Sequence, residues 1–380
     1  MKIVQLISRL DEIGGEQSHL IELVKQLHKN GHQILILTSN EPFIQQIIEI
    51  QDLGVEIEPL YFMKRKFHLW KDFRAIIEIR KRLKSFQPDL VAMHSSKAGV
   101  IGRIAAKSLG IPTVFTVHGW SFSEGVSKMK RLILEKVEKY LAKHTSKIIT
   151  VSTYDYQLAL QRKLVLQEKM ETIHNGIPTQ KTTEKISNNT PLIIMIARFA
   201  TPKRQDLLIQ ALSNMQEIPW KLILIGDGPN REQNEKRKND QNLQDRISFL
   251  GVRNDVERFL EQADINVLLS DYEGLPLVII ESMRACIPTI ASNVGGVSEL
   301  IIDQHSGLLV DNSISGIQKA ITLLIENISL RKQLGDNSRA TFEKHFTIDT
   351  MYAKTIQVYQ EVIKNAGNEN DVSQINRYKY

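Results

Sequence analysis

Short apolar segments alternate with amphipathic segments of helical period along this chain, and this alternation limits the fold more than any other feature. In the first half, buried strands are predicted at residues 3–7, 34–38, 90–93, 113–117 and 147–152. The segment Gln17–Lys29 is predicted to be a helix that Asn30 and Gly31 terminate. Strands that alternate with helices form a parallel sheet covered on both faces. The first half of the chain is therefore predicted to be a doubly wound α/β domain.

The alternation stops in a polar stretch over residues 172–191, predicted to be a linker, and then starts again. Further strands are predicted at residues 192–197, 221–225, 247–250, 265–268, 288–291 and 308–310. The 380 residues also suffice for two hydrophobic cores. The predicted organisation is an N-terminal domain at 1–180, a C-terminal domain at 190–350, a last helix at 351–366 and a flexible tail at 367–380. Ligands bind such sheets at the carboxyl ends of the strands, so a cleft between two facing domains is the expected site.

Basic charge is concentrated in the first half, where residues 1–180 hold 26 Lys and Arg against 18 Asp and Glu. In residues 63–84 and 128–147 these cations alternate with large apolar side chains at helical spacing, a pattern typical of a helix on an anionic membrane surface. An ordinary solvated helix face is the alternative. No apolar run is long enough to span a membrane or to act as a signal peptide, which predicts a cytoplasmic protein, peripheral at the inner face of the membrane. No nucleic-acid recognition motif accompanies the sequence pI of 9.1.

The strongest motif is a pair of glutamates eight residues apart with a tight turn between them. Glu273 precedes Gly274, Leu275 and Pro276, and Glu281 follows in the helix that the proline begins. The free amides at a helix start bind anions, which suits a diphosphate or sugar hydroxyls. Both carboxylates belong to one local element, so they cannot flank a bond from opposite faces as a glycosidase pair does. We interpret them as hydrogen-bond acceptors for hydroxyl groups, against the alternative of two ordinary surface glutamates.

Two cations follow the predicted strand 192–197 on a single loop. Arg198 offers a planar fork and Lys203 a point charge, and together they can bracket two phosphates. A leaving diphosphate gathers negative charge, so both cations would contribute most in the transition state. Taken alone, two solvated loop charges would give the same pattern.

Glycines and a histidine follow two strands of the first domain. Gly14 and Gly15 would let backbone amides approach a ligand closely, or would simply form a tight turn. The full glycine pattern of a dinucleotide site is absent. His118 directly follows the strand 113–117, where it would face the cleft and hydrogen-bond a hydroxyl of the donor or acceptor.

A second histidine segment combines the end of a strand with the start of a helix. His94, Ser95, Ser96 and Lys97 follow the strand 90–93, and the helix start with its lysine could hold an acceptor phosphate. A capping serine and a solvated lysine are the alternative. The remaining histidines are scattered without ligand spacing and no Asp-x-Asp occurs, so no metal site is predicted.

Taken in order, these motifs resemble glycosyltransferase family 4, whose members have the GT-B fold of two facing Rossmann-like domains. The resemblance covers residues 1–365. Further matching segments are Ile225-Gly226-Asp227-Gly228-Pro229, Phe249-Leu250-Gly251-Val252, Asn175-Gly176-Ile177-Pro178 and Gly295-Gly296-Val297-Ser298-Glu299. One departure is Arg204, where the family often has glycine; it adds positive charge to the loop.

The resemblance implies a retaining transfer from a UDP- or GDP-sugar, UDP being favoured, with no metal or other cofactor required. The resemblance also implies a role for each site residue. Glu281 would bind the ribose, Arg198 and Lys203 the diphosphate, and Glu273 with Gly274, Leu275 and Pro276 the donor sugar. His118 would lie beside the transferred sugar, Gly226, Leu250 and Val252 would surround the base, and Gly14 and Gly15 would also contact the donor. The last helix is expected to cross back onto the first domain.

A weaker resemblance links the histidine segments to enzymes that build capsule, O-antigen or exopolysaccharide units on polyprenyl-diphosphate carriers. It implies a lipid-linked glycan acceptor held by His94, Ser95, Ser96 and Lys97, and a hexose or N-acetylhexosamine as the transferred group. Two alternatives remain open. One is a nucleotide-sugar 2-epimerase, with Glu273 or Asp271 as its base, and the other is a non-catalytic protein that binds nucleotide sugars.

Overall fold

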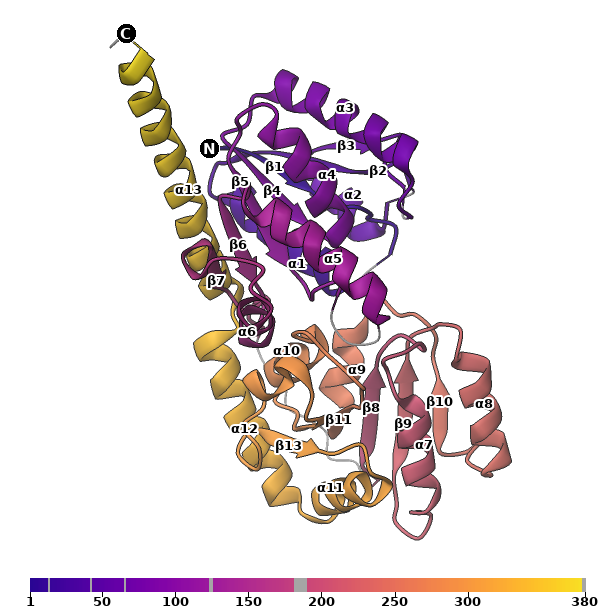
Figure 1. The fold of residues 1–380 in the computed structure, drawn as a ribbon. Coiled ribbons are helices and arrows are strands. Elements are labelled where there is room, and N and C mark those ends of the chain that lie inside the picture. The colour runs from indigo at the N-terminus through magenta and orange to yellow at the C-terminus, as the bar shows by residue number, and fades with distance from the viewer. Residues whose placement is uncertain (13, 42, 65, 123–125, 181–189, 378–380) are drawn as a thin grey trace. The chain divides into compact units, whose positions relative to one another are not determined.

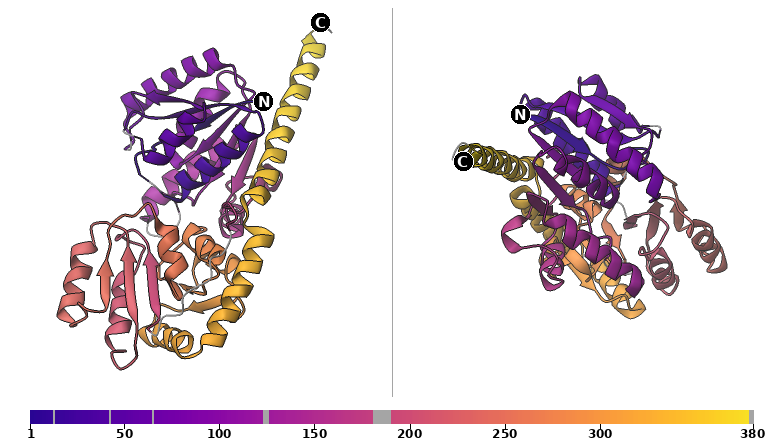
Figure 2. Two further views of the ribbon diagram at one scale, coloured as in Figure 1. Left: turned by 180° about the vertical axis from the view of Figure 1, so that it is seen from behind. Right: turned by 45° about the horizontal axis from the view of Figure 1, so that its top comes forward.

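The computed structural model describes residues 1–377 except 13, 42, 65, 123–125 and 181–189. The chain divides into two compact units, the first formed by Met1–Gly176 with Ile348–Tyr380 and the second by Ile177–Thr347. Residues 181–189 of the predicted linker lie outside the described residues. Figures 1 and 2 show the elements of each unit.

Unit 1 contains a seven-stranded sheet of order β3-β2-β1-β4-β5-β6-β7, and every neighbouring pair is parallel. Its strands are β1 (Lys2–Leu6), β2 (Gln33–Ser39), β3 (Glu56–Leu60), β4 (Leu90–His94), β5 (Thr113–Val117), β6 (Lys147–Thr150) and β7 (Met170–Thr172). Its helices are α1 (Gly15–Lys29), α2 (Gln45–Asp52), α3 (Leu69–Phe86), α4 (Ser96–Lys107), α5 (Lys128–Ala142), α6 (Thr153–Gln161), η1 (Gln167–Lys169) and α13 (Ile348–Arg377).

Apolar side chains on both faces of these strands explain the doubly wound arrangement. One face packs against α3, α4 and α5 in a core that includes Val4, Ala75 and Ile101. The other face packs against α1, α2 and α13, in a core to which α13 contributes Met351 and Tyr359. The left view of Figure 2 shows α13, in yellow, running along the side of unit 1.

Unit 2 repeats the plan with a six-stranded parallel sheet of order β10-β9-β8-β11-β12-β13. Its strands are β8 (Leu192–Ile196), β9 (Lys221–Ile225), β10 (Ile247–Phe249), β11 (Ile265–Leu268), β12 (Thr289–Ser292) and β13 (Gly307–Val310). Its helices are α7 (Gln205–Ser213), α8 (Arg231–Asp240), α9 (Val256–Gln262), α10 (Leu277–Arg284), η2 (Gly295–Glu299), α11 (Ile314–Glu326) and α12 (Ile328–His345). The main core lies under α7 and α11, and a smaller one lies under α9.

In both sheets the strand order reverses beside the first strand, between β1 and β4 in unit 1 and between β8 and β11 in unit 2. Side chains at these switch points lie in the crevice where ligands bind such folds. The predicted α/β fold class with two Rossmann-like domains is confirmed. Among the helices of the described residues, none combines the length and apolar character needed to cross a bilayer.

The structure differs from the sequence-based expectation at the sheet edges and at the carboxyl end. The edge strands β3 and β7 were not predicted, because β3 carries two glutamates and a proline and β7 has only three residues. Proline and polar side chains are tolerated at an edge, where one side of the strand needs no partner. The last helix begins at Ile348 and continues through Gly367 to Arg377, where a flexible tail was expected.

Candidate active site at the carboxyl ends of the two sheets

In unit 2, the loops that follow β8, β9, β10 and β11 are joined to one another by backbone hydrogen bonds. Phe199 N donates to Asp227 O at 3.0 Å, and Gly226 N donates to Gly251 O at 2.8 Å. Asp271 N donates to the carbonyl oxygen of Pro202 at 3.0 Å. All the motifs predicted in this half of the chain therefore lie along one edge of the sheet.

The centre of this edge is an ion pair between the two predicted motifs. Lys203 Nζ contacts Oε1 of Glu273, and Ser270 Oγ donates to the same oxygen at 2.5 Å. An antiparallel bridge between Lys203 and Ser270 holds the two loops in register. Both side chains of the ion pair are largely buried, with 19% and 10% of their surfaces exposed. The pairing places a cation and a carboxylate at the switch point of the sheet.

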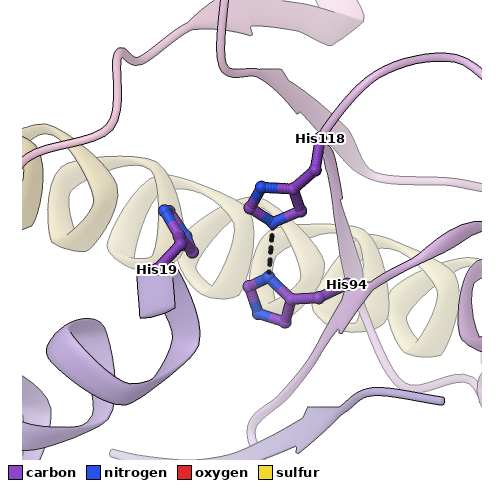
Figure 3. A group of neighbouring side chains, drawn as sticks. All are labelled: His19, His94 and His118. Atoms are coloured by element: carbon purple, nitrogen blue, oxygen red, sulfur yellow. Dashed lines mark hydrogen bonds between the residues drawn. The ribbon is translucent and has the colours of Figure 1, made fainter. Parts of the chain in front are cut away.

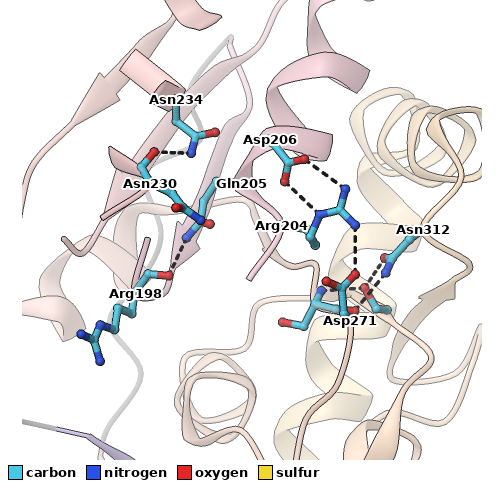
Figure 4. A network of polar contacts seen from close by, with 10 residues as sticks. Arg198, Arg204, Gln205, Asp206, Asn230, Asn234, Asp271 and Asn312 are labelled. Carbon is cyan, nitrogen blue, oxygen red and sulfur yellow. Dashed lines mark hydrogen bonds and ion pairs between the residues drawn. The ribbon is translucent and has the colours of Figure 1, made fainter. Parts of the chain in front are cut away.

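Arg204 forms a second set of ion pairs that connects the same two loops (Figure 4). Its guanidinium binds both carboxylate oxygens of Asp206 at 3.0 Å and Oδ1 of Asp271 at 2.9 Å. Hydrogen bonding to Asp206, supported by Asp271, raises the pKa of Arg204 further above its usual range, against the effect of burial. Arg204 does carry the expected positive charge, but the carboxylates of Asp206 and Asp271 compensate it.

Arg198 and Glu281 differ from this paired set. The Arg198 side chain is exposed, and its guanidinium has no carboxylate partner within the described part of the chain. Gln205 Nε2 holds its carbonyl oxygen at 3.1 Å. Glu281 lies half-buried in α10, where burial raises the pKa of its carboxyl and the Arg284 guanidinium opposes that shift. Among the described residues Arg198 is thus a cation without a carboxylate partner, and Glu281 is a carboxyl in a low-dielectric environment.

A glycine turn after β12 supports the loop that carries Glu273. Gly295 has φ +55°, and a Cβ there would lie 1.8 Å from the carbonyl oxygen of Glu273. Gly296 N donates to Gly274 O at 3.1 Å. Gly226 is equally confined, because its Cβ would lie 2.1 Å from Ala197 O. Beside Gly226, Leu250 and Val252 are exposed on the loop after β10.

In unit 1, a cavity of about 100 Å³ lies at the carboxyl ends of β4 and β5. Its lining residues are Glu16, Phe67, Ser95, Ser96, Val100, Phe115, Thr116, Val117, His118, Gly119, Trp120, Ser121, Leu134, Val137 and Glu138. Three predicted acceptor or donor residues, Ser95, Ser96 and His118, therefore share one cavity. Ser95 has φ +74° and its hydroxyl accepts from Ser8 N at 3.2 Å, so its strained backbone is tied to the loop after β1.

Lys97 does not reach this cavity as an unpaired cation. It is 4% exposed, forms a 2.6 Å ion pair with Asp72 and donates to the carbonyl oxygen of Lys66 at 2.7 Å. Its ammonium also lies 5.3 Å from the ring centre of Phe67. These contacts compete with the predicted contact between Lys97 and an acceptor phosphate, which stays a prediction.

Three histidines of unit 1 converge beside the cavity (Figure 3). His94 Nδ1 lies 3.3 Å from His118 Nε2, His94 Nε2 lies 2.8 Å from Gln5 Oε1, and His19 Nδ1 lies 2.8 Å from Asn175 Oδ1. Burial lowers the pKa of all three imidazoles, that of His19 to about 4, so each is neutral near pH 7. One nitrogen of each ring lies within 4.8 Å of the others, which is enough to hold a metal ion. The absence of a metal therefore stays a prediction.

Gly14 and Gly15 lie where α1 begins, with Gly14 as the residue before its first turn. Gly14 has extended backbone, and a Cβ there would meet only the flexible end of Gln17. The site residues that sequence analysis missed are supporting ones, Gln5, His19 and Ser270. Gln5 lies in the apolar strand β1, His19 in α1 and Ser270 just after β11. No sequence pattern connects the three, and only the fold brings these side chains to the site.

The chain matches two protein families over nearly its whole length. Residues 13–181 match glycosyltransferase family 4, and residues 177–341 match the glycosyl transferases of group 1. An Escherichia coli UDP-Gal:α-D-GlcNAc-diphosphoundecaprenol α-1,3-galactosyltransferase is 30% identical in an alignment of 322 residues that covers 79% of this chain and 82% of that protein.

A second relative agrees with this family, and a solved structure agrees with the fold. The Escherichia coli O-antigen biosynthesis glycosyltransferase WbnH is 30% identical over 316 residues, or 82% of this chain and 87% of the relative. The crystal structure of Anabaena Alr3699/HepE in complex with UDP is similar in fold, with a TM-score of 0.79 at 20% identity. The similarity covers 95% of this chain and all of the other.

Proposed function

This chain belongs to glycosyltransferase family 4, and we propose that it transfers a hexose or N-acetylhexosamine from a UDP-sugar, or a GDP-sugar, to a polyprenyl-diphosphate-linked glycan. The reaction would retain the configuration at the anomeric carbon and would require no metal. It would serve the synthesis of a cell-surface polysaccharide at the inner face of the membrane.

The contact between Lys203 and Glu273 is the observation that carries this proposal. It brings a cation of the kind that binds phosphate next to a carboxylate that can accept hydrogen bonds from sugar hydroxyls, at the switch point of a Rossmann-like sheet, and this supports the proposal. Exposed Arg198 would supply a second cation for the diphosphate, and Glu281 would accept hydrogen bonds from ribose. Lys203 and Arg198 would then stabilise the negative charge that develops on the leaving diphosphate.

The proposed mechanism is front-face transfer. The acceptor oxygen bonds to the anomeric carbon on the side from which the diphosphate leaves, as the bond from that carbon to the phosphate oxygen breaks. The acceptor proton passes to a leaving phosphate oxygen, so no side chain has to act as nucleophile. Trapping of a covalent sugar on any carboxylate of the enzyme would exclude this mechanism.

The acceptor is inferred from the galactosyltransferase that is 30% identical, whose name specifies an N-acetylglucosamine linked to diphosphoundecaprenol. A lipid-linked acceptor requires contact with a membrane. In unit 1, large apolar side chains on α3 and α5 are exposed, and Leu69, Trp70 and Met129 have 91%, 76% and 76% of their surfaces exposed. Exposed cations flank them at Lys71, Arg74, Lys81, Lys84, Lys128, Lys130, Lys136 and Lys139. We propose that this α3–α5 surface binds the anionic membrane.

The decisive experiment measures nucleoside-diphosphate release from a panel of UDP- and GDP-sugars in excess EDTA, with and without synthetic polyprenyl-diphosphate N-acetylglucosamine. Release that depends on the lipid for one donor supports the proposal and identifies that donor. Conversion of the donor to its 2-epimer without transfer would support the epimerase alternative instead.

A matched pair of variants tests whether unit 2 performs this reaction. Lys203→Gln should lower turnover about a hundredfold or more, because it removes one charge-stabilising group. Lys236→Gln removes a cation from an exposed surface pair with Asp240 and should leave turnover unchanged. Normal donor affinity without turnover on any acceptor would favour a non-catalytic binding protein.

A further inference from the structure

A buried hydrogen-bonded chain in unit 1 runs from Gln5 through His94 to His118 and ends at an atom without a partner. His94 contacts Gln5 Oε1 through Nε2 at 2.8 Å and His118 Nε2 through Nδ1 at 3.3 Å. The remaining ring nitrogen, Nδ1 of His118, is buried and has no partner among the described residues. Leaving a buried polar atom unsatisfied costs about 1–3 kcal/mol. This unpartnered nitrogen therefore indicates a hydrogen-bond partner that is not part of the polypeptide.

The carboxamide oxygen of Gln5 determines which nitrogen of each imidazole in this hydrogen-bonded chain carries the proton. The carboxamide oxygen of Gln5 only accepts, so the proton of His94 is on Nε2. The buried imidazole of His94 is neutral and holds one proton, so its Nδ1 is bare and accepts from Nε2–H of His118. His118 is also neutral, and its own Nδ1 must then be a bare acceptor.

The bare nitrogen belongs to a residue that lines the cavity at the ends of β4 and β5. Ser95, Ser96 and Gly119 line the same cavity, whose volume of about 100 Å³ exceeds that of a single water site. A neutral nitrogen acceptor in such a place selects a donor, such as the hydroxyl of a sugar. A phosphate oxygen offers only lone pairs near neutral pH and would be rejected there.

We propose that Gln5 and His94 are positioning residues that fix the proton of His118 on Nε2, so that His118 Nδ1 accepts a hydrogen bond from a ligand hydroxyl in the cavity. The identity of the ligand as a sugar rests on the proposed function, whereas the order of protons does not. The chain of contacts makes His118 an acceptor and excludes a role as proton donor through Nδ1.

The three histidines could hold a metal ion instead, and the geometry favours the hydrogen-bonded chain. The two facing nitrogens of His94 and His118 are joined to each other by a hydrogen bond (Figure 3), whereas metal ligands point to a shared third position. Within the described residues the cluster contains His19, His94 and His118 alone, with no carboxylate. Binding of a metal ion by these three histidines is therefore a competing outcome of the test.

Long-range ¹H–¹⁵N NMR of the full-length protein at neutral pH separates protonated from bare imidazole nitrogens. The expected spectrum has His118 protonated on Nε2 and bare at Nδ1, and His94 protonated on Nε2. A proton on Nδ1 of His118 would mean that Gln5 donates to His94 and would overturn the proposal. Elemental analysis after dialysis against EDTA covers the other outcome, since one retained equivalent of metal would also overturn it.

Two variants separate positioning from simple packing. In His94→Gln the new amide oxygen can still accept from His118 Nε2–H, so His118 should keep its single tautomer. In His94→Leu that acceptor is lost, and His118 should become a mixture of both neutral tautomers. Donor turnover should fall about tenfold in His94→Leu and recover in His94→Gln. Equal spectra for the two variants contradict the proposal, and an inactive wild-type protein with the expected spectrum contradicts only the proposed function.

Discussion

The buried imidazoles of unit 1 make its stability depend on pH, and His19 gives the clearest case. Its pKa is about 4 in the folded protein, because burial disfavours the charged ring, against about 6.5 in an unfolded chain. As pH falls below 6.5 the unfolded chain takes up this proton first. The contribution of His19 to stability is therefore present at pH 7 and is lost as pH falls toward 4.

We expect His19 to account for about 2 kcal/mol of the loss in free energy of unfolding between pH 7 and pH 5. Urea unfolding of the wild type and His19→Gln at both pH values measures this difference, because glutamine does not titrate. The control is His68→Gln, which removes an exposed histidine of the same unit. An identical pH dependence for wild type and His19→Gln would show that the buried ring does not control it.

Individual site residues differ in how well the sequence predicts their role. Lys203 and Glu273 were predicted as site residues because phosphate and hydroxyl groups require such side chains, and the fold brings the two together. Lys97 and Arg204 have the same chemistry in the sequence, but the structure pairs Lys97 with Asp72 and Arg204 with Asp206 and Asp271. The partner of Lys203, in contrast, is Glu273, a predicted donor-binding residue. The local sequence around a cation is the same whether the side chain is free or paired, because its partner can lie far away in the sequence.

At the scale of elements, the turn before η2 controls the position of the loop that carries Glu273. In Gly295→Ala the new Cβ would collide with the carbonyl oxygen of Glu273, at a backbone conformation that already disfavours alanine. A displacement of about 1 Å can cost about a hundredfold in rate, and we expect a loss of this size in donor turnover. Steady-state turnover of the folded variant, verified by circular dichroism, is the measurement.

Gly31→Ala is the matched control for this variant. Gly31 has φ +76° and no atom near its missing Cβ, so alanine there meets strain without collision. It should lose about 1 kcal/mol of stability and keep its turnover. If both variants were equally active, the glycine turn would not position Glu273.

The α3–α5 surface of unit 1 gives a second prediction at this scale. The double variant Leu69→Ser with Trp70→Ser removes two exposed apolar side chains from the start of α3. It should weaken binding to anionic phosphatidylglycerol vesicles about tenfold or more, since each side chain inserted into lipid contributes about 1.5–3 kcal/mol. Cosedimentation with vesicles measures this affinity.

The control for membrane binding is Ile328→Ser, which removes an exposed apolar side chain from unit 2. It should bind anionic vesicles as the wild type does. Added salt should weaken wild-type binding, because it screens the cations around the α3–α5 surface. Equal binding of the wild type to neutral and anionic vesicles would contradict the electrostatic part of the proposal.

Central strands were predictable, whereas the two edge strands of the unit 1 sheet, β3 and β7, were not, for a physical reason. Residues 113–117, 221–225 and 265–268 form strands with the predicted bounds, because a strand buried on both faces is apolar throughout. The edge strand β3 has one buried residue, Leu60, in its burial pattern, and its composition is close to that of a loop. The two strands that were not predicted, β3 and β7, are therefore incompletely buried ones.

At the scale of the whole molecule, unit 1 is built from both ends of the chain. Met351, Val358, Tyr359 and Val362 of α13 join the core formed by α1, α2 and the sheet. Backbone Gly176 N donates to Sδ of Met351, so the end of the first segment is tied to the start of α13. The apolar period of α13 predicts a helix, but nothing in that period specifies which sheet it covers.

Tyr359→Ala tests whether α13 is an integral part of unit 1. The tyrosine side chain is fully buried, and truncating a large buried aromatic side chain costs about 3–5 kcal/mol. Hydrogen exchange with mass spectrometry should show about a hundredfold or faster exchange in the most protected peptides of unit 1, with unit 2 as an internal reference. Gln357→Ala, an exposed position on the same helix, should leave exchange unchanged. Unchanged protection in Tyr359→Ala would mean that the sheet and α1 form a stable core without α13, which the burial of five α13 side chains in that core, Ile348 included, argues against.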